Sequence, residues 1–403
     1  MAKPEIRLKG FEGEWKECPL GDISTSFSGG TPSAGVAKYY GGNIPFIRSG
    51  EIAGDKTQLF ITEEGLDASS ARIVEKGTLL YALYGATSGE VSISKIDGAI
   101  NQAILAIYPK KGYSTKYLSH YLRSKKDNIV STLLQGGQGN LSGALVKSIN
   151  VNLPETSEEQ DAIANYLDSM DTLIQSTTKK IVSLKQMKQA CLVSMFPQAG
   201  ETTPRVRFKG FEGEWECEPL CNFSKKVIKK NQNLEYKITL TNSAEYGIIN
   251  QLDFFDHDVS NGDNIRGYYI VENDDFVYNP RISATAPVGP INRNLLGYAG
   301  VMSPLYYVFR VHGIDKDYMS VFFKTTLWHK FMKDNGNSGA RFDRLSITDD
   351  VFVQMPILYP KDIKEQQRIA SYFRSLDKQI SLQEKRLEKL KQIKAACLDK
   401  MFM

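Results

Sequence analysis

The sequence predicts an α+β protein in which two mixed globular domains are separated by two long coiled-coil helices, with an internal pseudo-two-fold repeat. Two observations predict this fold class. Residues 9–15 return unchanged as residues 209–215, and the helical pattern of residues 157–196 returns 206 positions later. Seven identical residues that include a tryptophan indicate an internal duplication. Each half of the chain therefore contains the short repeated segment, a variable region and a long helix.

The repeats also predict the domain boundaries. The first globular domain covers residues 1–156 and the first long helix residues 157–196. A short polar linker with a proline at each end, residues 197–204, leads into the second globular domain, residues 205–362. The second long helix covers residues 363–403.

Both long helices carry a narrow apolar stripe. Its residues recur in alternating steps of four and three, with two skips, which is the heptad pattern of a coiled coil. Neither helix contains an internal Gly or Pro, and Pro197 directly follows the first helix, where it prevents continuation. A rise of 1.5 Å per residue gives each helix a length of roughly 55–60 Å, which is typical of a spacer. The predicted seam consists of Ile163, Leu167, Met170, Ile174, Ile181, Leu184, Ile369, Phe373, Leu376, Ile380, Leu387 and Leu390.

The two variable regions do not align with each other, but both combine strand-like and helix-like segments. Apolar runs bounded by turn residues predict strands. These runs are residues 44–47, 78–84, 103–107, 276–278 and 305–310. Helical patterns occupy residues 117–128, with a basic outer face, and residues 318–331.

Composition places the chain among ordinary globular proteins. Of its 403 residues, 41% are hydrophobic and 24% are charged, and the net charge of +4 permits a nucleic-acid partner without requiring one. Five cysteines are an odd number and form no disulfide framework. No apolar stretch is long enough to span a membrane, and the charged N-terminus is not that of a signal peptide. We expect a cytoplasmic protein that does not contact a membrane.

Signatures of covalent chemistry are missing. No Gly-Lys dipeptide occurs, which excludes a Walker A phosphate loop, and there is no His-Glu-x-x-His segment. The four histidines are scattered, and Cys217 and Cys221 lack a second ligand pair for zinc. We therefore expect no catalytic residue, no metal site and no enzyme activity.

Several loops combine glycine with hydroxyl, amide, arginine and tyrosine side chains. Glycine permits close approach of the backbone to a phosphate, and Ser, Thr and Tyr bind phosphate oxygens. Arginine forms paired hydrogen bonds with guanine, as Asn and Gln do with adenine. Basic residues that could attract DNA are Lys110, Lys111, Lys116, Arg123, Lys125, Lys126, Lys225, Lys226, Lys229 and Lys230.

The order of these loops resembles one known family. Residues 29–33 (Gly-Gly-Thr-Pro-Ser), residues 42–52, residues 86–89 and Asn101-Gln102 are similar to the target-recognition domain of a type I restriction-modification specificity subunit. Segments that resemble the exit of that domain into its long helix, or a second version of the domain, are residues 140–142, 149–154, 158–160, 276–283 and 303–309.

The resemblance implies two target-recognition domains held apart by the two helices, which pack antiparallel. Each domain would read one half of a bipartite target in double-stranded DNA, and the helices would fix the spacer between the halves. Partners would be two methyltransferase subunits and, in the full complex, motor-nuclease restriction subunits. The methyl donor S-adenosylmethionine would be bound by the methyltransferase and no cofactor by this chain. Candidate DNA-binding residues are Thr31, Tyr39, Arg48, Ser49, Tyr84, Thr87, Ser88, Asn101, Gln102, Gln135, Gln138, Thr241, Asn242, Asn279, Arg281, Ser283, Ser338 and Arg341.

Two questions stay open at this point. The repeated segments 9–15 and 209–215, called the frames below, could dock methyltransferase subunits, together with the exposed helix faces, or could serve only to pack helix against domain. A scaffold that binds proteins, not DNA, through its two globular ends is the alternative function. An enzyme with an unrecognised site is a third, less favoured class.

Overall fold

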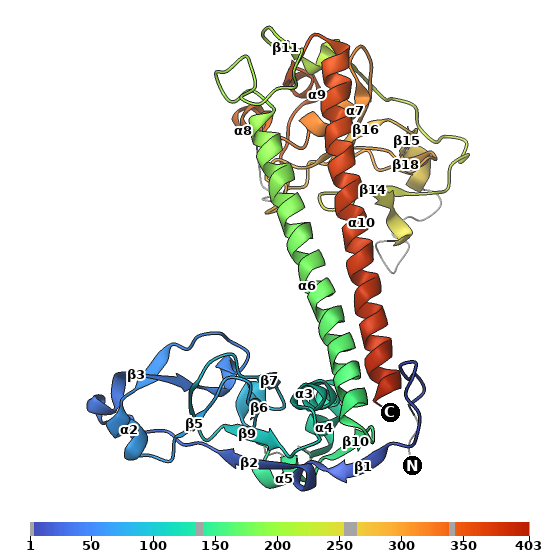
Figure 1. Cartoon of the computed structure of the whole chain (residues 1–403). Coiled ribbons are helices and arrows are strands. Elements are labelled where there is room, and N and C mark those ends of the chain that lie inside the picture. The colour runs from blue at the N-terminus through green and yellow to red at the C-terminus, as the bar shows by residue number, and fades with distance from the viewer. Residues whose placement is uncertain (1–3, 134–139, 254–263, 338–342, 403) are drawn as a thin grey trace. The chain divides into compact units, whose positions relative to one another are not determined.

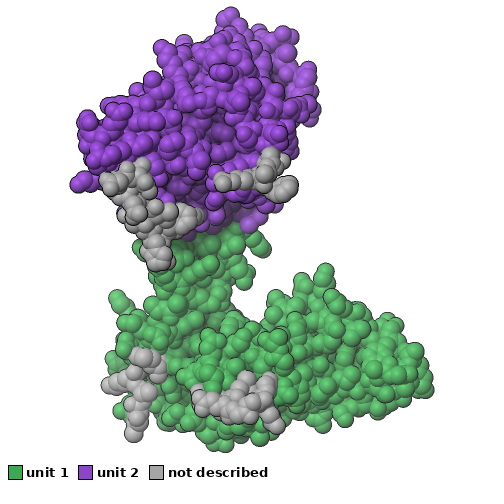
Figure 2. All heavy atoms as spheres, turned by 180° about the vertical axis from the view of Figure 1, so that it is seen from behind, with its two compact units in different colours: residues 1–179, 385–403 green, residues 180–384 purple. Residues whose placement is uncertain are grey.

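The computed structural model describes residues 4–133, 140–253, 264–337 and 343–402. The chain divides into unit 1, residues 1–179 and 385–403, and unit 2, residues 180–384 (Figure 2). Both boundaries fall inside long helices, α6 (Ser157–Ser194) and α10 (Ile363–Met401) (Figure 1). Each unit therefore contains the start of one long helix and the end of the other.

Unit 1 is built on two four-stranded sheets. In the first, the strand order is β2 (Ser24–Ser28), β9 (Ile104–Pro109), β6 (Leu79–Ala82) and β7 (Val91–Ile93). In the second it is β4 (Leu59–Ile61), β3 (Tyr40–Ile47), β8 (Gly98–Ile100) and β5 (Arg72–Val74). The other elements are β1 (Lys16–Pro19), which pairs with β10 (Asn150–Leu153), and the helices α1 (Leu20–Ile23), α2 (Glu63–Asp67), α3 (Thr115–Ser124), α4 (Lys126–Leu133) and α5 (Gly143–Lys147).

Strand β6 lies between two hydrophobic cores. Successive side chains of a strand point to opposite faces of the sheet. Leu79 and Tyr81 accordingly join the core that contains α3 and the start of α6, whereas Leu80 and Ala82 join a second core with Ile47 and Ile100. This double burial explains the continuous apolar run that predicts a strand here.

Unit 2 repeats the plan of the first sheet. Its strand order is β12 (Ser224–Lys226), β19 (Tyr307–Val311), β16 (Phe276–Tyr278) and β17 (Ile291–Arg293). Two-stranded sheets take the place of the second sheet: β13 (Leu240–Ser243) with β14 (Gly247–Asn250), and β15 (Tyr269–Val271) with β18 (Gly300–Met302). The other elements are β11 (Glu216–Pro219), which pairs with β20 (Pro356–Tyr359), and the helices α7 (Lys316–Phe322), α8 (His329–Asn335) and α9 (Asp349–Phe352). The two variable regions thus share a sheet plan that their sequences do not reveal.

The frames pack against the long helices. Arg7 forms a two-point ion pair with Glu159, the third residue of α6, and donates to the carbonyl oxygens of Glu12 and Gly13. In unit 2, Arg207 makes the same contacts with Glu365 and with the carbonyl oxygens of residues 212 and 213. The two glutamate side chains are only 2% exposed. These contacts favour a structural role for the frames.

The residue after each buried glutamate fixes the neighbouring domain helix. Gln160 accepts a hydrogen bond from the backbone N–H of Ser114, the N-cap of α3 (2.9 Å). Gln366 does the same for Asp315, the N-cap of α7 (2.9 Å). Capping side chains satisfy N–H groups that a helix leaves unpaired at its start. The Glu-Gln dipeptide therefore joins frame, long helix and domain helix in both units.

The end of each long helix completes a core. The Phe402 ring packs edge-on against Tyr117 and Tyr121 in unit 1. The Phe196 ring packs against Trp215 and Tyr318 in unit 2. Each core is thus closed by a phenylalanine from the helix that starts in the other half of the sequence.

Inside each unit, the helix segments run antiparallel. In unit 2, Lys185, Lys188 and Cys191 contact Glu384, Asp377 and Tyr372, so the partner number falls as the residue number rises. In unit 1, Lys394 and Cys397 contact Asp171 and Tyr166 in the equivalent way. The same ion pair and the same Cys–Tyr contact therefore recur in both units.

The twelve predicted seam residues are not equally buried. Ile174, Leu387 and Leu390 are half-buried, and the other nine are buried. Ile163 and Leu167 lie in the core of unit 1 with Trp15, so the start of α6 faces its domain. A continuous coiled-coil seam stays a prediction.

Two predicted helices are divided in the structure. Residues 117–128 belong to α3 and α4, and six consecutive residues of α3, 117–122, are buried, so the expected basic outer face is narrow. Residues 318–331 belong to α7 and α8. Between α7 and α8, the Thr325 hydroxyl donates to the carbonyl oxygen of Phe322.

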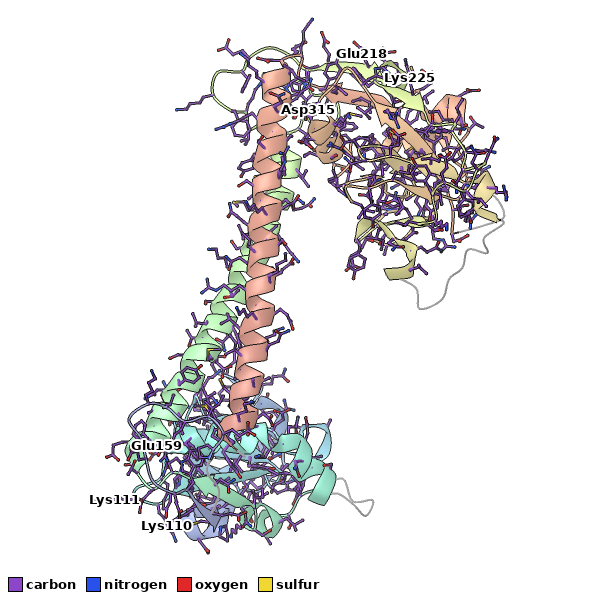
Figure 3. All side chains as sticks on the ribbon, turned by 90° about the vertical axis from the view of Figure 1, so that its right-hand side faces the viewer. Lys110, Lys111, Glu159, Glu218, Lys225 and Asp315 are labelled. Carbon is purple, nitrogen blue, oxygen red and sulfur yellow. The ribbon has the colours of Figure 1, made fainter. Side chains whose placement is uncertain are left out.

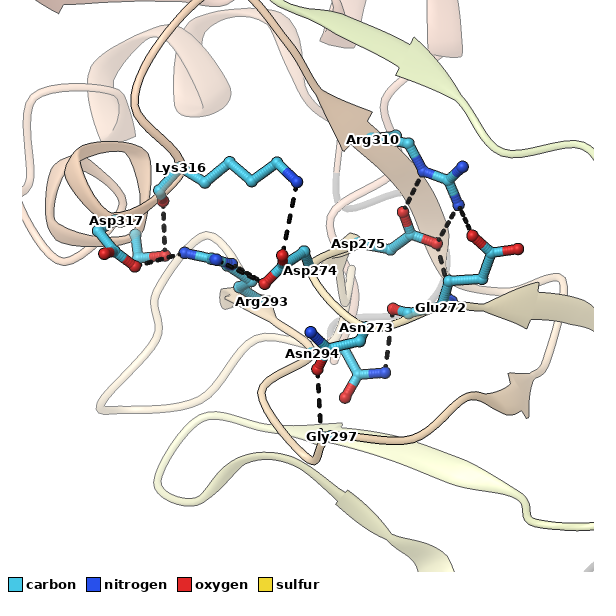
Figure 4. A network of polar contacts seen from close by, with 11 residues as sticks. Glu272, Asn273, Asp274, Asp275, Arg293, Asn294, Gly297, Arg310, Lys316 and Asp317 are labelled. Atoms are coloured by element: carbon cyan, nitrogen blue, oxygen red, sulfur yellow. Dashed lines mark hydrogen bonds and ion pairs between the residues drawn. The ribbon is translucent and has the colours of Figure 1, made fainter. Parts of the chain in front are cut away.

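A network of ion pairs fixes the turn between β15 and β16 (Figure 4). The fully buried Asp275 carboxylate accepts hydrogen bonds from Arg310 of β19 (2.7 and 3.0 Å). Arg293 of β17 joins Asp274 to Asp317 of α7, and Asp317 also pairs with Arg374 of α10. A buried carboxylate requires such partners, and here they join the sheet of unit 2 to its helices.

Replacement of Arg207 by methionine should lower the free energy of unfolding by about 3 kcal/mol, because Glu365 then stays buried without a charged partner. Urea unfolding of the full chain measures this loss. The matched control is Lys361→Met, which removes the exposed pair with Glu216 and should cost less than about 1 kcal/mol. Equal losses of unfolding free energy in the two variants would contradict the importance of the buried Arg207–Glu365 ion pair.

Candidate nucleic-acid interface

In unit 1, several predicted DNA-binding residues meet where strands end. Strands β3 and β8 pair in parallel, with Ile47 opposite Ile100. The next residues, Arg48 and Asn101, therefore leave the sheet at the same edge. The loop after β2 reaches this edge, where the Thr31 hydroxyl donates to the Gln102 amide oxygen (2.5 Å). Ser49 begins a short 3₁₀ helix at the same edge.

The two glycines before Thr31 serve the fold. The Gly30 N–H donates to the carbonyl oxygen of Ile100 (3.2 Å). A Cβ atom on Gly29 would lie 1.8 Å from that oxygen, and one on Gly30 would lie 2.6 Å from the Cβ of Ser70. Close approach to the protein's own backbone thus explains both glycines, where the sequence suggests approach to a phosphate.

Arg48 is held by an acidic neighbour. Its Nε and Nη2 atoms donate to the two carboxylate oxygens of Glu51 (3.1 and 3.0 Å). Glu51 also accepts from the Thr57 hydroxyl and the Gln58 N–H. The Arg48 hydrogen bond is the main cause that lowers the pKa of Glu51 to about 2. A base contact by Arg48 would therefore compete with an existing ion pair.

The other candidates in unit 1 come from separate segments. Tyr39 is half-buried in the turn before β3. Tyr84 and Thr87 lie in the loop after β6, where Tyr84 is exposed and Thr87 donates to its carbonyl oxygen. Ser88 is buried and its hydroxyl donates to the carbonyl oxygen of Leu83 (2.9 Å), so this donor is already used inside the protein.

Unit 2 brings its candidates together around one hollow of about 560 Å³. Arg281 and Arg344 lie opposite each other in an isolated β-bridge at its edge. The Arg281 side chain is 64% exposed, and its nearest acidic atom, on Asp343, is 3.7 Å away. The predicted residues on this surface are Thr241, Asn242, Asn279, Arg281 and Ser283.

Sequence reasoning missed several residues of this hollow. Arg344 follows shortly after the predicted Arg341, and Leu305 and Tyr306 belong to residues 303–309, which carry part of the family resemblance. Tyr306 shares a hydrogen bond between hydroxyl groups with Thr241 (3.1 Å). The sequence thus pointed to the segments that contain these residues, but not to the individual side chains that line the hollow. Further lining residues are Ser243, Gln251, Tyr268 and Ser303.

Asn242 lies at the floor of the hollow and is only 2% exposed. Its side-chain amide donates to the carbonyl oxygens of Val277 and Pro290 and accepts from Asn292. A side chain with these contacts supports the hollow, because its amide nitrogen and oxygen are already bonded inside the protein. Gln135, Gln138, Ser338 and Arg341 lie outside the described residues.

Three of the ten predicted basic residues form ion pairs with acidic side chains of the described residues. Lys116 contacts Asp168 (3.0 Å), Lys126 contacts Glu90 (2.5 Å) and Lys226 contacts Asp349. Figure 3 shows Lys110 and Lys111 of unit 1 and Lys225 on β12 of unit 2. Lys225 is exposed at the edge of its sheet. The net attraction for a polyanion is therefore smaller than the number of lysines suggests.

Comparison with known protein families identifies the family of the two domains that carry these surfaces. The family model described as "Type I restriction modification DNA specificity domain" matches residues 12–186 and again residues 223–392. The chain belongs to this family. Each match includes one of the two candidate surfaces.

Curated members of the specificity-domain family are similar over part of their length. The chain is 31% identical over 175 residues to the type I restriction enzyme MjaIX specificity subunit of Methanocaldococcus jannaschii, which covers 41% of this chain and 40% of that protein. It is 26% identical over 193 residues to the type I restriction enzyme EcoR124I/EcoR124II specificity subunit of Escherichia coli, which covers 46% of this chain and 47% of that protein. The chain thus spans less than half the length of these two relatives in each alignment.

A solved structure extends the likeness to the whole fold. The S subunit of a type I restriction-modification system from M. genitalium superposes with a TM-score of 0.59, covering 100% of this chain and 99% of that chain. The sequence identity is 15%, so this likeness shows the fold alone. The fold has mixed helix and sheet content with two specificity domains.

In the part of the chain that the structure describes, neither a membrane-spanning helix nor a metal-binding cluster is found. None of its helices has the length and hydropathy needed to cross a membrane. No group of three or more His, Cys, Asp or Glu side chains there is arranged to hold a metal ion.

The depressed pKa of Glu51 predicts a pH dependence of stability. Above its ordinary pKa of 4.5, the carboxylate is charged in the folded and the unfolded chain, so its pair with Arg48 contributes fully. As the pH falls toward about 2, the unfolded chain binds the proton first and the contribution is lost.

The difference in free energy of unfolding between the wild type and Glu51→Gln should therefore be constant above pH 4.5 and shrink between pH 4.5 and 2. Denaturant unfolding across this range measures it. Glu14→Gln, at an exposed glutamate of the same unit, corrects for the change in net charge. A difference that does not vary with pH would contradict the ion pair.

Proposed function

We propose that this protein is the DNA sequence-specificity subunit of a type I restriction-modification complex. The observation that carries the proposal is the double match to the DNA specificity domain, once in each half of the chain. The names of the curated relatives, which are specificity subunits of type I restriction enzymes, agree with it.

Each unit would read one half of a bipartite target in double-stranded DNA. In unit 2, Asn279 and Arg281 stand at the hollow with side-chain types that read adenine and guanine through paired hydrogen bonds. Tyr306 and Ser283 could bind phosphate oxygens. In unit 1, the corresponding candidates are Thr31, Arg48, Asn101 and Gln102 at the shared strand edge. Because the two surfaces carry different side chains, the two half-sites should differ in sequence.

The long helices would act as an antiparallel spacer with a pseudo-two-fold relation between the halves. Helix α6 has 38 residues, which corresponds to about 57 Å. Half-sites one helical turn of DNA apart are about 34–36 Å from centre to centre. The antiparallel contacts that recur in both units support this arrangement.

The chain would have no catalytic activity of its own and would bind no cofactor. Two methyltransferase subunits, which bind S-adenosylmethionine, would dock on it, and restriction subunits would join for cleavage. Within the frames, Trp15 and Trp215 are buried in the cores, and the carbonyl oxygens of residues 12, 13, 212 and 213 accept from Arg7 and Arg207, while most of the other frame residues are exposed. The docking surface would include the exposed large apolar residues of the two long helices, which are Leu173, Val182, Met187, Val193, Ile363, Leu382 and Ile393, together with the exposed parts of the frames.

The first test is the methylation pattern of DNA in cells that express this chain with its methyltransferase. A split sequence motif that is methylated only when this chain is present is expected. An active methyltransferase whose motif does not depend on this chain would overturn the proposal. Binding of proteins but of no DNA duplex at any salt concentration would favour a scaffold.

Arg281→Ala should relax recognition in one half-site only. The loss of a paired hydrogen bond to a base reduces discrimination by about 1–3 kcal/mol at that position. Sequencing of methylated DNA from the intact complex measures the preference at every position of both half-sites. Lys330→Ala removes an equal charge from an exposed site in unit 2 and should leave the motif unchanged. A motif unaltered by Arg281→Ala would remove Arg281 from the readers.

A further inference from the structure

A chain of side-chain hydrogen bonds crosses unit 2 from the helices to the floor of the hollow. The Lys324 ammonium group donates to Oδ1 of Asn292 on β17 (2.5 Å). Asn292 Nδ2 then donates to Oδ1 of Asn242 (2.7 Å) and to the carbonyl oxygen of Ser243 (3.1 Å), both on β13. Asn242 Nδ2 in turn donates to the carbonyl oxygens of Val277 (2.7 Å) and Pro290 (3.2 Å).

The direction of this hydrogen-bond network is fixed from both ends. At one end, the carbonyl oxygens of Val277 and Pro290 can only accept, so Asn242 turns its amide nitrogen toward them and its oxygen toward Asn292. An ammonium group only donates hydrogen bonds, whereas an Asn side chain presents an acceptor on one side and a donor on the other. Lys324 therefore requires the oxygen of Asn292 to face it. The amide nitrogen of Asn292 must then face Asn242, whose oxygen must face Asn292.

The bonded amides join two separate sheets. Asn242 belongs to the β13–β14 hairpin, whereas Val277 and Asn292 belong to the sheet that contains β16 and β17. Asn242 and Asn292 are both buried, and the side-chain amide nitrogen and oxygen of each have a hydrogen-bond partner. Reversal of one amide would leave buried polar atoms unpaired, which is costly.

The same contacts continue to the edge of the hollow. Asn279 Nδ2 donates to the carbonyl oxygen of Asn242 (2.8 Å), and the Arg281 N–H donates to Asn279 Oδ1 (3.0 Å). The position of Asn242 therefore affects the segment that presents Asn279 and Arg281. At the other end, Lys324 lines a second hollow of about 490 Å³ together with residues of α6 and α10.

We propose that Lys324 is a positioning residue for sequence recognition by unit 2. It supplies the partner of the Asn292 amide oxygen, holds Asn292 against Asn242, and thereby holds the segment with Asn279 and Arg281 in its reading geometry. This inference rests on the proposed function, in which the hollow reads one half-site.

Unit 2 itself offers a matched control. Lys330 carries the same side chain and charge as Lys324, but its ammonium group pairs with the exposed carboxylate of Asp334 (2.6 Å). Lys330→Met makes the same chemical change outside the hydrogen-bond network and should not change the motif.

The experiment measures methylation motifs of the full chain in its methyltransferase complex. Lys324→Met should reduce preference about fivefold to tenfold in the half-site read by unit 2, the value of one net hydrogen bond, and leave the other half-site unchanged. Lys324→Arg keeps a donor and should restore the preference. Asn292→Asp should also relax that half-site, because a carboxylate cannot donate to Asn242, although its pair with Lys324 becomes stronger.

The outcomes separate the inference from the proposed function. A wild-type chain that confers no motif means that the proposed function fails. A normal wild-type motif with unchanged preference in Lys324→Met and Asn292→Asp overturns only the positioning role. Weakening of both half-sites in parallel with reduced thermal stability would indicate a purely structural residue and would also overturn it.

Discussion

The structure depends on two buried carboxylates. Glu159 and Glu365 each stand in the first turn of a long helix, and a charge that is almost removed from water requires a charged partner. Arg7 and Arg207 supply it, and their remaining guanidinium donors bind carbonyl oxygens of the frames. Because the adjacent glutamines hold the N-caps of α3 and α7, one dipeptide sets the geometry of each junction.

The constant and the variable parts of each unit occupy different places. The first sheet has the same strand order in both units and faces the core that contains the long helices. The pairs β1–β10 and β11–β20 also correspond, whereas the other strands form one four-stranded sheet in unit 1 and two two-stranded sheets in unit 2. The candidate surfaces include loops from these variable strands. This separation allows the candidate surface to change while the junction with the helices stays the same.

Repetition and periodicity made the long helices and the frames predictable, because an identical segment such as residues 9–15 is visible without any structure. Buried strands such as β6 and β16 were also predictable from continuous apolar runs. The division between α7 and α8 was not, because residues 318–331 contain no Gly or Pro that would mark a break.

The candidate site was predictable only at the level of segments. Arg48 and Arg281 have the same side chain, yet the Arg48 guanidinium is paired with Glu51, whereas the Arg281 side chain is largely exposed. Asn242 has the composition of a base reader and the burial of a core residue. Such differences arise from partners that folding brings together from distant segments, and local sequence does not contain them.

The position of Phe402 has a consequence for synthesis on the ribosome. The core of unit 1 needs this ring against Tyr117 and Tyr121, although nearly all other residues of that core precede position 168. The first domain therefore leaves the ribosome without the Phe402 ring. Its core stays incomplete until the whole of unit 2 has been translated. Unit 2 has no such delay, since Met195 and Phe196 emerge before it. The domain that is made first is thus the last to finish folding.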